Sequence, residues 1–304
     1  MKKISWRTPL CLLSCMVLLW FLADAAGVRE AVSGGLRLCA QSVVPALFPF
    51  LVVTTLLLRL GLGELLSPLF SGLMTPLFRL PGTGASALLL GLIGGYPVGA
   101  KTAAELYAAG LLTRDEGERL LAFCNNANPV FLISVLGVGV FGSVRAGVWL
   151  WLIHVVSALL TGLLFRGGGK PTRRQSPPPI PLTVPFSVAL VDAVRSALAG
   201  MLSVCAFVVF FYVLVQPLAG LGGRVGTLLV GVTELFSVIP LLEPSPAGFV
   251  LAAGLAGWGG LSVLCQTAAV LDGSGLSPRN ALPGKLLQAL LSVALALPLA
   301  GYAL

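Results

Sequence analysis

The chain has 304 residues, of which 57% are hydrophobic and only 10% are charged, and its formal net charge is +8. Soluble domains carry about 25% charged residues, so this chain lacks the charge for a water-exposed surface. Its mean hydropathy of +0.99 also excludes a disordered protein. One histidine and six scattered cysteines without a CxxC pair exclude a multi-histidine metal site and indicate small buried hydrophobic cysteines. We therefore expect a multi-pass membrane protein without metal or cofactor.

Apolar runs of membrane-spanning length recur along the whole chain. A spanning helix needs about 20 apolar residues, and the runs are continuous rather than alternating, which favours helices over strands. The runs are 8–23, 38–58, 80–100, 120–144, 146–165, 196–223, 225–242 (interrupted by Glu234), 244–271 and 286–304. Prolines and glycines inside many of them predict discontinuous helices, which a membrane tolerates where protein or a cavity satisfies the backbone.

The N-terminal run allows two interpretations. Lys2, Lys3 and Arg7 precede it, and Ala23-Asp24-Ala25 resembles a small-x-small cleavage site. Residues 1–26 are therefore an uncleaved transmembrane anchor or a cleaved secretory signal. Both interpretations place residue 27 on the outer side of the membrane.

A basic linker at 166–181 divides the chain into segments 27–165 and 182–304. It carries four positive charges and no negative one, so the positive-inside rule predicts a cytoplasmic location. We interpret this positive charge as a sign of membrane topology and not of nucleic-acid binding, because the chain has no basic domain that could bind nucleic acid.

The two halves resemble each other in sequence. Leu88, Gly91, Leu92 and Gly94 match Leu251, Gly254, Leu255 and Gly257 at a constant offset, and residues 102–104 match residues 267–269. If residue 27 is outside and the linker is inside, the first half crosses the membrane an odd number of times. The second half then starts inside and has the opposite orientation in the membrane from the first. The run 120–144 is then the best candidate for a re-entrant segment. We expect an all-α polytopic protein with two inverted repeats, discontinuous helices and re-entrant hairpins, as in secondary transporters; a duplicated scaffold without transport is the alternative.

The string at 94–102 is the most distinctive in the first half. Its residues are Gly94, Gly95, Tyr96, Pro97, Val98, Gly99, Ala100, Lys101 and Thr102. It is no phosphate-binding P-loop, because Ala100 separates Gly99 from Lys101. Glycine and proline predict an unwound segment whose backbone could face a ligand. Lys101 forms a helical pair with Glu105 or meets an anionic substrate, and we count Gly94, Gly95, Tyr96, Pro97, Lys101 and Thr102 as substrate-binding candidates.

A second string places three amides in an uncharged run. Asn125, Asn126 and Asn128 are costly in lipid unless they are paired or face water. Pro129 suits the first turn of a new helix, and Asn126 or Asn128 suits its cap. The positive end of that helix could bind a carboxylate or phosphate; structural capping alone is the alternative.

Other polar residues within apolar runs are further candidates. His154 and Glu234 are ionisable and could hold a coupling proton or cation, whereas a lone buried histidine is commonly a hydrogen-bonded interior residue. Gln266 and Thr267 occupy the place of Lys101 and Thr102 in the second repeat. At 112–119 we expect an exposed helix with a Thr113–Glu116 capping box and no function. No pattern indicates an enzyme.

The strings at 95–101, 110–121 and 125–132 resemble the YlbJ family of sporulation integral membrane proteins, which carry the nucleoside-recognition (Gate) domain. The resemblance runs from about residue 35 over nearly the whole chain. The wider Gate group is similar to the core of concentrative nucleoside transporters. In this family a small residue is expected at the position of Asn128, which leaves the specificity of this chain open.

The resemblance implies transport of dipicolinic acid across the outer forespore membrane of endospore-forming bacteria, on the mother-cell side. Its partners are then a small anionic substrate and membrane lipids, with a protein partner or a homo-oligomer also open. Lys101 and the asparagine-capped helix would suit the carboxylates of this dianion. A nucleoside carrier and a non-transporting membrane subunit or scaffold are the alternatives.

Overall fold

The computed structural model describes residues 7–167 and 185–304, and within these ranges the ordered elements are helices. Before the gap they are α1 (Arg7–Ala23), α2 (Ala25–Leu38), a π-helical turn (Cys39–Val43), α3 (Val44–Arg59), α4 (Leu62–Phe78), α5 (Gly84–Gly94), α6 (Val98–Ala108), α7 (Arg114–Leu120), a π-helical segment (Phe131–Val140) and α8 (Val144–Leu164). After the gap they are α9 (Phe186–Ala219), α10 (Gly223–Thr233), a 3-10 turn (Ile239–Leu241), α11 (Pro246–Trp258), α12 (Leu261–Leu271), a 3-10 turn (Pro278–Asn280) and α13 (Ala281–Ala303). Residues 168–181 of the basic linker lie outside the described residues, and so do residues 1–6, which include Lys2 and Lys3 of the expected anchor or signal.

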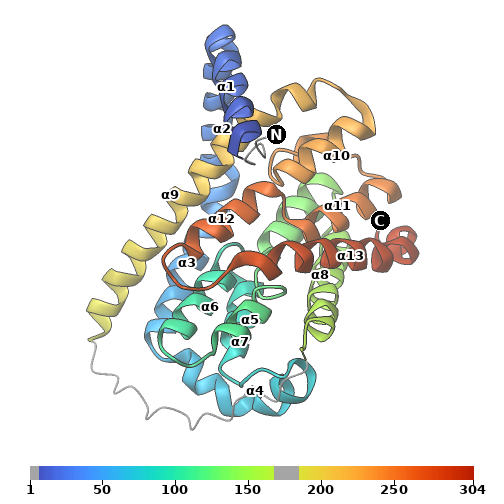
Figure 1. The fold of residues 1–304 in the computed structure, drawn as a ribbon. Coiled ribbons are helices and arrows are strands. Elements are labelled where there is room, and N and C mark those ends of the chain that lie inside the picture. The colour runs from blue at the N-terminus through green and yellow to red at the C-terminus, as the bar shows by residue number, and fades with distance from the viewer. Residues whose placement is uncertain (1–6, 168–184) are drawn as a thin grey trace, which may run out of the picture.

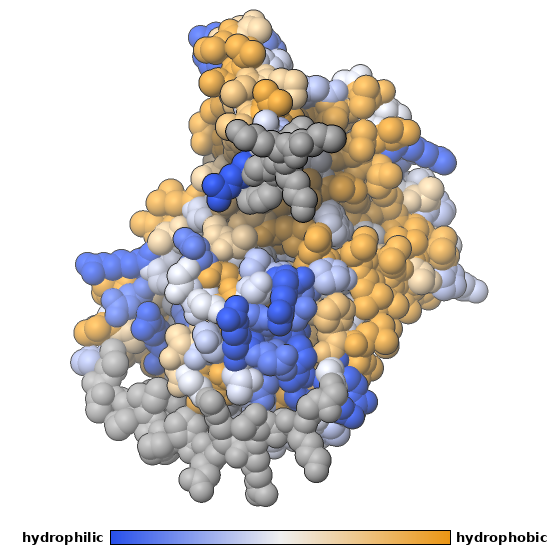
Figure 2. Space-filling model, in the orientation of Figure 1, coloured by the Kyte–Doolittle hydropathy of each residue, from blue (hydrophilic) through white to orange (hydrophobic). Residues whose placement is uncertain are grey.

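Five helical segments of the described chain are long and apolar enough to cross a membrane. They are Ala25–Arg59, Val144–Leu164, Phe186–Ala219, Pro246–Leu271 and Pro278–Ala303. Shorter apolar helices stand beside them, at Arg7–Ala23, Leu65–Phe78, Gly84–Gly94 and Phe131–Val140. The protein is therefore a multi-pass integral membrane protein, and Figure 2 shows the broad hydrophobic surface that such a protein presents to lipid.

Two expected spans are interrupted in the structure. The run 80–100 divides into α5 and α6, with Gly95 in the left-handed region (φ +83°) where α5 ends. The run 244–271 divides in the same way into α11 and α12, at Gly259 (φ +84°) and Gly260 (φ +92°). Only glycine adopts these dihedral angles without steric cost, so the prediction of discontinuous helices is confirmed at both places.

Three features differ from the sequence-based expectation. The run 225–242 forms no continuous helix, because α10 ends at Thr233 and Glu234 takes an extended conformation. Helix α4 was not expected, because the charge-free stretch 65–78 is shorter than a spanning segment. The expected capping box of α7 is present, with Thr113 and Glu116 bonded reciprocally, but α7 is not an exposed helix.

The buried side of α7 carries a carboxylate that connects the two halves of the chain. Glu118 is 1% exposed and pairs with Arg114 on its own helix and with Arg279 of the second half, each at 2.8 Å. The amide of Ser277 donates to Glu118 at 3.2 Å. Figure 2 shows a hydrophilic patch in the region where Figure 1 places α7, so this is a polar end of the molecule.

The apolar packing forms two clusters. The larger one joins α3, α8, α9, α11 and α13 with the π-helical segment 131–140, and the smaller one joins α4 to α7 with Leu271 and Leu276. Helix α9 crosses the body obliquely, while α1 and α2 project from one end (Figure 1). Helix α9 contacts α2, α3, α10 and α12, and thereby spans segments from both halves.

Candidate functional site

The two helix breaks meet inside the protein. The hydroxyl of Tyr96, in the break between α5 and α6, donates a hydrogen bond to the carbonyl of Ala256 near the end of α11, at 2.9 Å. The same ring lies beside Gly259, where an added Cβ would stand 3.1 Å from the phenol oxygen. Helix α12 also packs against α6. The loop that the sequence singled out therefore contacts its counterpart in the second half.

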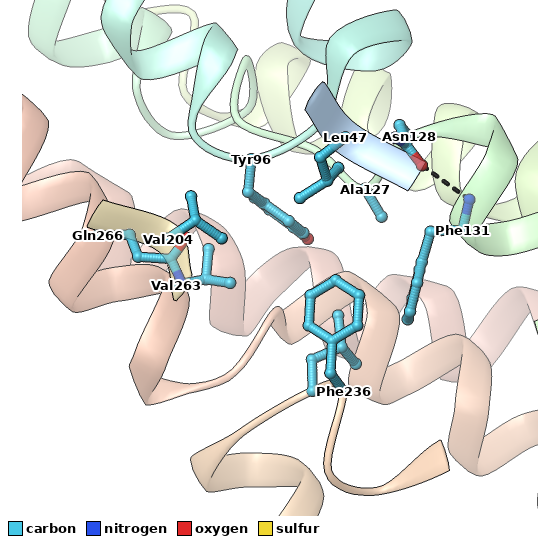
Figure 3. A pocket seen from close by; sticks show the side chains of 10 residues that line it. Leu47, Tyr96, Ala127, Asn128, Phe131, Val204, Phe236, Val263 and Gln266 are labelled. Atoms are coloured by element: carbon cyan, nitrogen blue, oxygen red, sulfur yellow. Dashed lines mark hydrogen bonds between the residues drawn. The ribbon is translucent and has the colours of Figure 1, made fainter. Parts of the chain in front are cut away.

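A small cavity lies at this junction. It is lined by Leu47, Tyr96, Ala127, Asn128, Phe131, Val204, Leu235, Phe236, Val263 and Gln266 (Figure 3). Its volume of about 10 Å³ is room for about one water molecule. The Phe131 and Phe236 rings, which pack edge to face with their centroids 5.0 Å apart, close one side. The cavity therefore has no room for an organic ligand in this structure.

The asparagine motif caps a helix as predicted. The side-chain oxygen of Asn128 accepts a hydrogen bond from the amide of Phe131 at 2.7 Å (Figure 3). Its side-chain nitrogen donates to the carbonyl of Ala46 on α3 at 2.9 Å. The helix begins at Pro129, where proline costs no hydrogen bond. Asn128 thus fixes the start of this helix against α3 while its side chain lines the cavity.

The other two asparagines reach into the second half. Asn125 donates to the hydroxyl of Thr267 on α12 at 2.8 Å. Asn126 accepts from the side-chain nitrogen of Gln288 on α13 at 3.0 Å and donates to the carbonyl of Phe123 at 2.8 Å. Both asparagines are at least 98% buried. Their amides therefore join the halves in the interior, where an unpaired polar group costs most.

His154 of α8 belongs to the same cluster. Its Nε2 accepts a hydrogen bond from the amide of Ala127 at 3.1 Å and lies 3.4 Å from the side-chain nitrogen of Gln288. Because Nε2 is the acceptor, the neutral ring carries its proton on Nδ1. Nδ1 is buried and has no hydrogen-bond partner within the described ranges. One turn further, Ser157 accepts from Ser292 of α13 at 2.9 Å.

Lys285 is a member of the cluster that the sequence analysis did not select. It is 2% exposed, its Nζ donates to the side-chain oxygen of Gln288 at 2.8 Å, and it lies 4.9 Å from the centre of the Tyr96 ring. The sequence shows it only as the charged residue bordering the last apolar run. The structure explains its burial, because a Cβ built at the neighbouring Gly284 would lie only 2.3 Å from the carbonyl oxygen of Ala122. The start of α13 is therefore pressed into the protein interior.

Lys101 does not join the asparagines. Its Nζ donates to the hydroxyl of Ser196 on α9, and in the described part of the chain it forms no ion pair with Glu105. The neighbouring Thr102 is fully buried, and its hydroxyl lacks a partner among the described residues. Among the described residues, no hydrogen bond joins Lys101 to the asparagine amides with which it was expected to act.

The remaining candidates occupy different surroundings. Gln266 lines the cavity and donates to Ser262 at 3.2 Å, while Thr267 contacts Asn125. Glu234 is 1% exposed, and its carboxylate accepts from the amide and hydroxyl of Ser237 at 2.5 and 2.6 Å. No hydrogen bond joins Glu234 to the asparagine cluster within residues 7–167 and 185–304. In those ranges no three histidine, cysteine or acidic residues are grouped to hold a metal ion.

The fold and this junction define a polytopic helical membrane protein whose broken helices meet around a buried polar cluster. Residues 40–147 match the Gate family, described as nucleoside recognition. Over 203 residues the chain is 32% identical to the sporulation integral membrane protein YlbJ of Bacillus subtilis (strain 168), in an alignment that covers 60% of this chain and 50% of YlbJ. The chain thus spans about half the length of this curated relative. No solved structure matches it. The resemblance indicated by the sequence is confirmed, although the alignment covers 60% of the chain and not nearly all of it.

Proposed function

We propose that the protein transports a small anion across the membrane, and that the anion is dipicolinate, moved across the outer forespore membrane during sporulation. The observation that carries this proposal is the buried polar cluster at the meeting point of the two helix breaks. Polar groups at membrane depth are expensive and mark substrate or ion pathways. The similarity to the sporulation protein YlbJ supports the biological setting.

We further propose that residues 27–165 and 182–304 are inverted repeats. In each half a long apolar helix (α3 or α9) is followed by α4 or α10 and then by a broken pair, α5–α6 or α11–α12. This shared order supports a repeat, and inverted repeats with broken helices place the substrate site at their interface. The candidate contacts are the backbone and side chains of Gly94–Pro97, Asn125, Asn126, Asn128, Pro129, Gln266 and Thr267.

Transport requires this junction to open. Dipicolinate is many times larger than a water molecule, and the cavity of about 10 Å³ has room for about one water. Tyr96 and Phe236 line opposite parts of the cavity, one from each half (Figure 3). Relative movement of the halves would separate them and expose the asparagines and Gln266 to a substrate.

Two other functions have specific support. The Gate match, described as nucleoside recognition, favours a nucleoside carrier, and competition of dipicolinate uptake by nucleosides separates the two substrates. The small, mainly apolar cavity favours a non-transporting membrane subunit that needs a protein partner. The buried amides, histidine and lysine argue against this second alternative, because an apolar interface of the same shape would be cheaper to bury.

The decisive experiment measures dipicolinate uptake into liposomes that contain only this protein, with and without a pH gradient. Uptake that depends on the gradient supports a self-sufficient coupled transporter and directs mutagenesis to Glu234 and His154. Uptake that ignores the gradient supports a facilitator. No uptake by a well-folded preparation contradicts the proposal and favours the partner-dependent subunit.

Lys101 is a separate part of the proposal and has its own test. As a cation at the edge of the broken pair, held by Ser196, it could attract the substrate. We expect Lys101→Ala to abolish dipicolinate accumulation while the protein still reaches the membrane. Unchanged accumulation would remove Lys101 from the substrate path without affecting the transporter proposal.

A further inference from the structure

Lys285 is a cation buried without a counter-charge among the described residues. It is 2% exposed, and the ion pairs of the described chain all involve α7, namely Arg114–Glu118, Arg119–Asp115 and Arg279–Glu118. A buried ammonium is unfavourable unless an opposite charge and hydrogen bonds compensate its lost hydration. Within the described part of the chain, Lys285 therefore lacks the anionic partner that would stabilise its ammonium form.

The present partners of Lys285 are neutral. Lys285 has three N–H groups, and one of them donates a hydrogen bond to the side-chain oxygen of Gln288 at 2.8 Å. The centre of the Tyr96 ring lies 4.9 Å from Nζ. An amide oxygen and an aromatic face stabilise a cation, but neither neutralises it.

The surroundings of Lys285 contain other polar groups without partners. Gln288 also donates to Asn126 and approaches His154, which places Lys285 within the cluster that joins the halves. The Nδ1 of His154 and the side-chain oxygen of Asn125 are buried and have no hydrogen-bond partner in the described ranges. Nδ1 carries the ring proton and can therefore donate to an oxygen ligand. Buried groups that remain unsatisfied in this way need an explanation, and a missing ligand provides one.

Tyr96 connects Lys285 to the cavity. Its ring faces Nζ and also lines the cavity (Figure 3). Lys101, by contrast, contacts Ser196, which directly follows Arg195 at the border of the charge-free part of α9. Both lysines contact the other half, but of the two only Lys285 contacts the buried polar cluster and the Tyr96 ring.

We propose that Lys285 binds a carboxylate of the transported anion. The inference rests on the proposed function and names the charged ligand at that site. When the halves open, the carboxylate replaces the Gln288 oxygen and the Tyr96 ring as partner of Nζ, and the Nδ1–H of His154 supplies a second donor. The substrate class is a small planar or compact carboxylate, since the ligand must fit between Tyr96 and the asparagine motif.

The test measures dipicolinate binding to the purified full chain in detergent, as the ligand-induced rise in melting temperature. Lys285→Met removes the terminal amine and its charge while keeping an unbranched side chain one atom shorter, whereas Lys285→Arg keeps the charge. Arg145→Met is the matched control, because it removes an exposed positive charge from α8 outside the cluster. The neutral dimethyl ester of dipicolinate tests the charge requirement on the unaltered protein.

We expect Lys285→Met to bind dipicolinate about 10- to 100-fold more weakly, which is the range for the loss of one charged hydrogen bond. Lys285→Arg and Arg145→Met retain binding, and the dimethyl ester stabilises no variant. If Lys285→Met binds as tightly as the unaltered chain, or the ester binds as well as the dianion, the inference is overturned while the transporter proposal stands. If the unaltered chain binds and transports no dipicolinate, both are overturned. If Lys285→Met does not fold, binding of the ester as tight as that of the dianion still overturns the inference.

Discussion

Replacing Gly99 by alanine tests how closely the broken pair α5–α6 is packed. A Cβ at Gly99 would lie 1.9 Å from the carbonyl oxygen of Cys124, and one at Gly91 would lie 1.8 Å from the same atom. The carbonyl that precedes Asn125 is thus held between two glycines, one on each helix. Ordinary contact begins near 3.4 Å, so the backbone of residues 124–125 must move by about 1.5 Å to admit a methyl group.

The magnitude follows from two opposing effects. Overpacking a buried site costs up to about 3 kcal/mol, and here the obstacle is backbone, which adapts poorly. Alanine in place of glycine within a helix gains about 1 kcal/mol. The net destabilisation is therefore about 2 kcal/mol, or roughly 5 °C in melting temperature for a protein of this size. Uptake should fall as well, because Asn125 moves with Cys124 and loses Thr267.

The assay heats the protein in detergent and uses size-exclusion chromatography to measure how much folded protein remains at each temperature. Gly72→Ala is the matched control. Gly72 lies in α4, and a Cβ there meets no atom within 4 Å. We expect Gly72→Ala to melt at or above the temperature of the unaltered chain. If Gly99→Ala melts as high as Gly72→Ala, the carbonyl of Cys124 is not confined as described and the reasoning is wrong.

Two further predictions concern the connection between the halves and the asparagine cap. Burial alone would raise the pKa of Glu118, but hydrogen bonds from Arg114 and the Ser277 amide and the charge of Arg279 outweigh burial and hold this pKa below its ordinary value. Glu118 therefore stabilises the fold at pH values above the ordinary glutamate pKa, and this stabilisation is lost as the pH falls through the lowered pKa of Glu118. Between pH 6 and pH 3, the melting temperature of Glu118→Gln should fall less than that of the unaltered chain. If both melting temperatures fall equally with pH, Glu118 does not stabilise the fold in this way. Asn128→Ala removes the cap on the Phe131 amide and should cost about 1 kcal/mol, whereas Asn128→Ser retains a capping oxygen and should melt higher; equal melting temperatures would show that the cap contributes nothing.

Local signals in the sequence predicted the local features of the structure. The glycines at 94–95 and 259–260 broke their helices, Asn128 capped the helix that starts at Pro129, and Thr113 formed its capping box. Each of these depends on dihedral angles or hydrogen bonds within a few residues of the chain. Such features are readable without knowing what packs against them.

The features that depend on tertiary packing were not predictable in this way. Lys101 and Lys285 both border apolar runs, yet one contacts α9 and the other enters the polar cluster. Which side a lysine faces is decided by close contacts such as the one between Gly284 and Ala122, which link residues far apart in the sequence. Helix α7 was expected to be exposed for the same reason, because its partner Arg279 belongs to the other half.

The length of α9 has a consequence for the surrounding lipid. Its charge-free part, 196–219, is about 36 Å long at 1.5 Å per residue, against a hydrocarbon thickness of about 30 Å. A tilt of about 35° from the membrane normal would accommodate this mismatch. In Figure 1, α9 runs obliquely along one side of the body. Because α9 packs against α3 of one half and α10 and α12 of the other, a thinner or thicker bilayer changes its inclination and thereby bears on both halves. The thickness of the host membrane therefore affects how the two halves are positioned relative to each other.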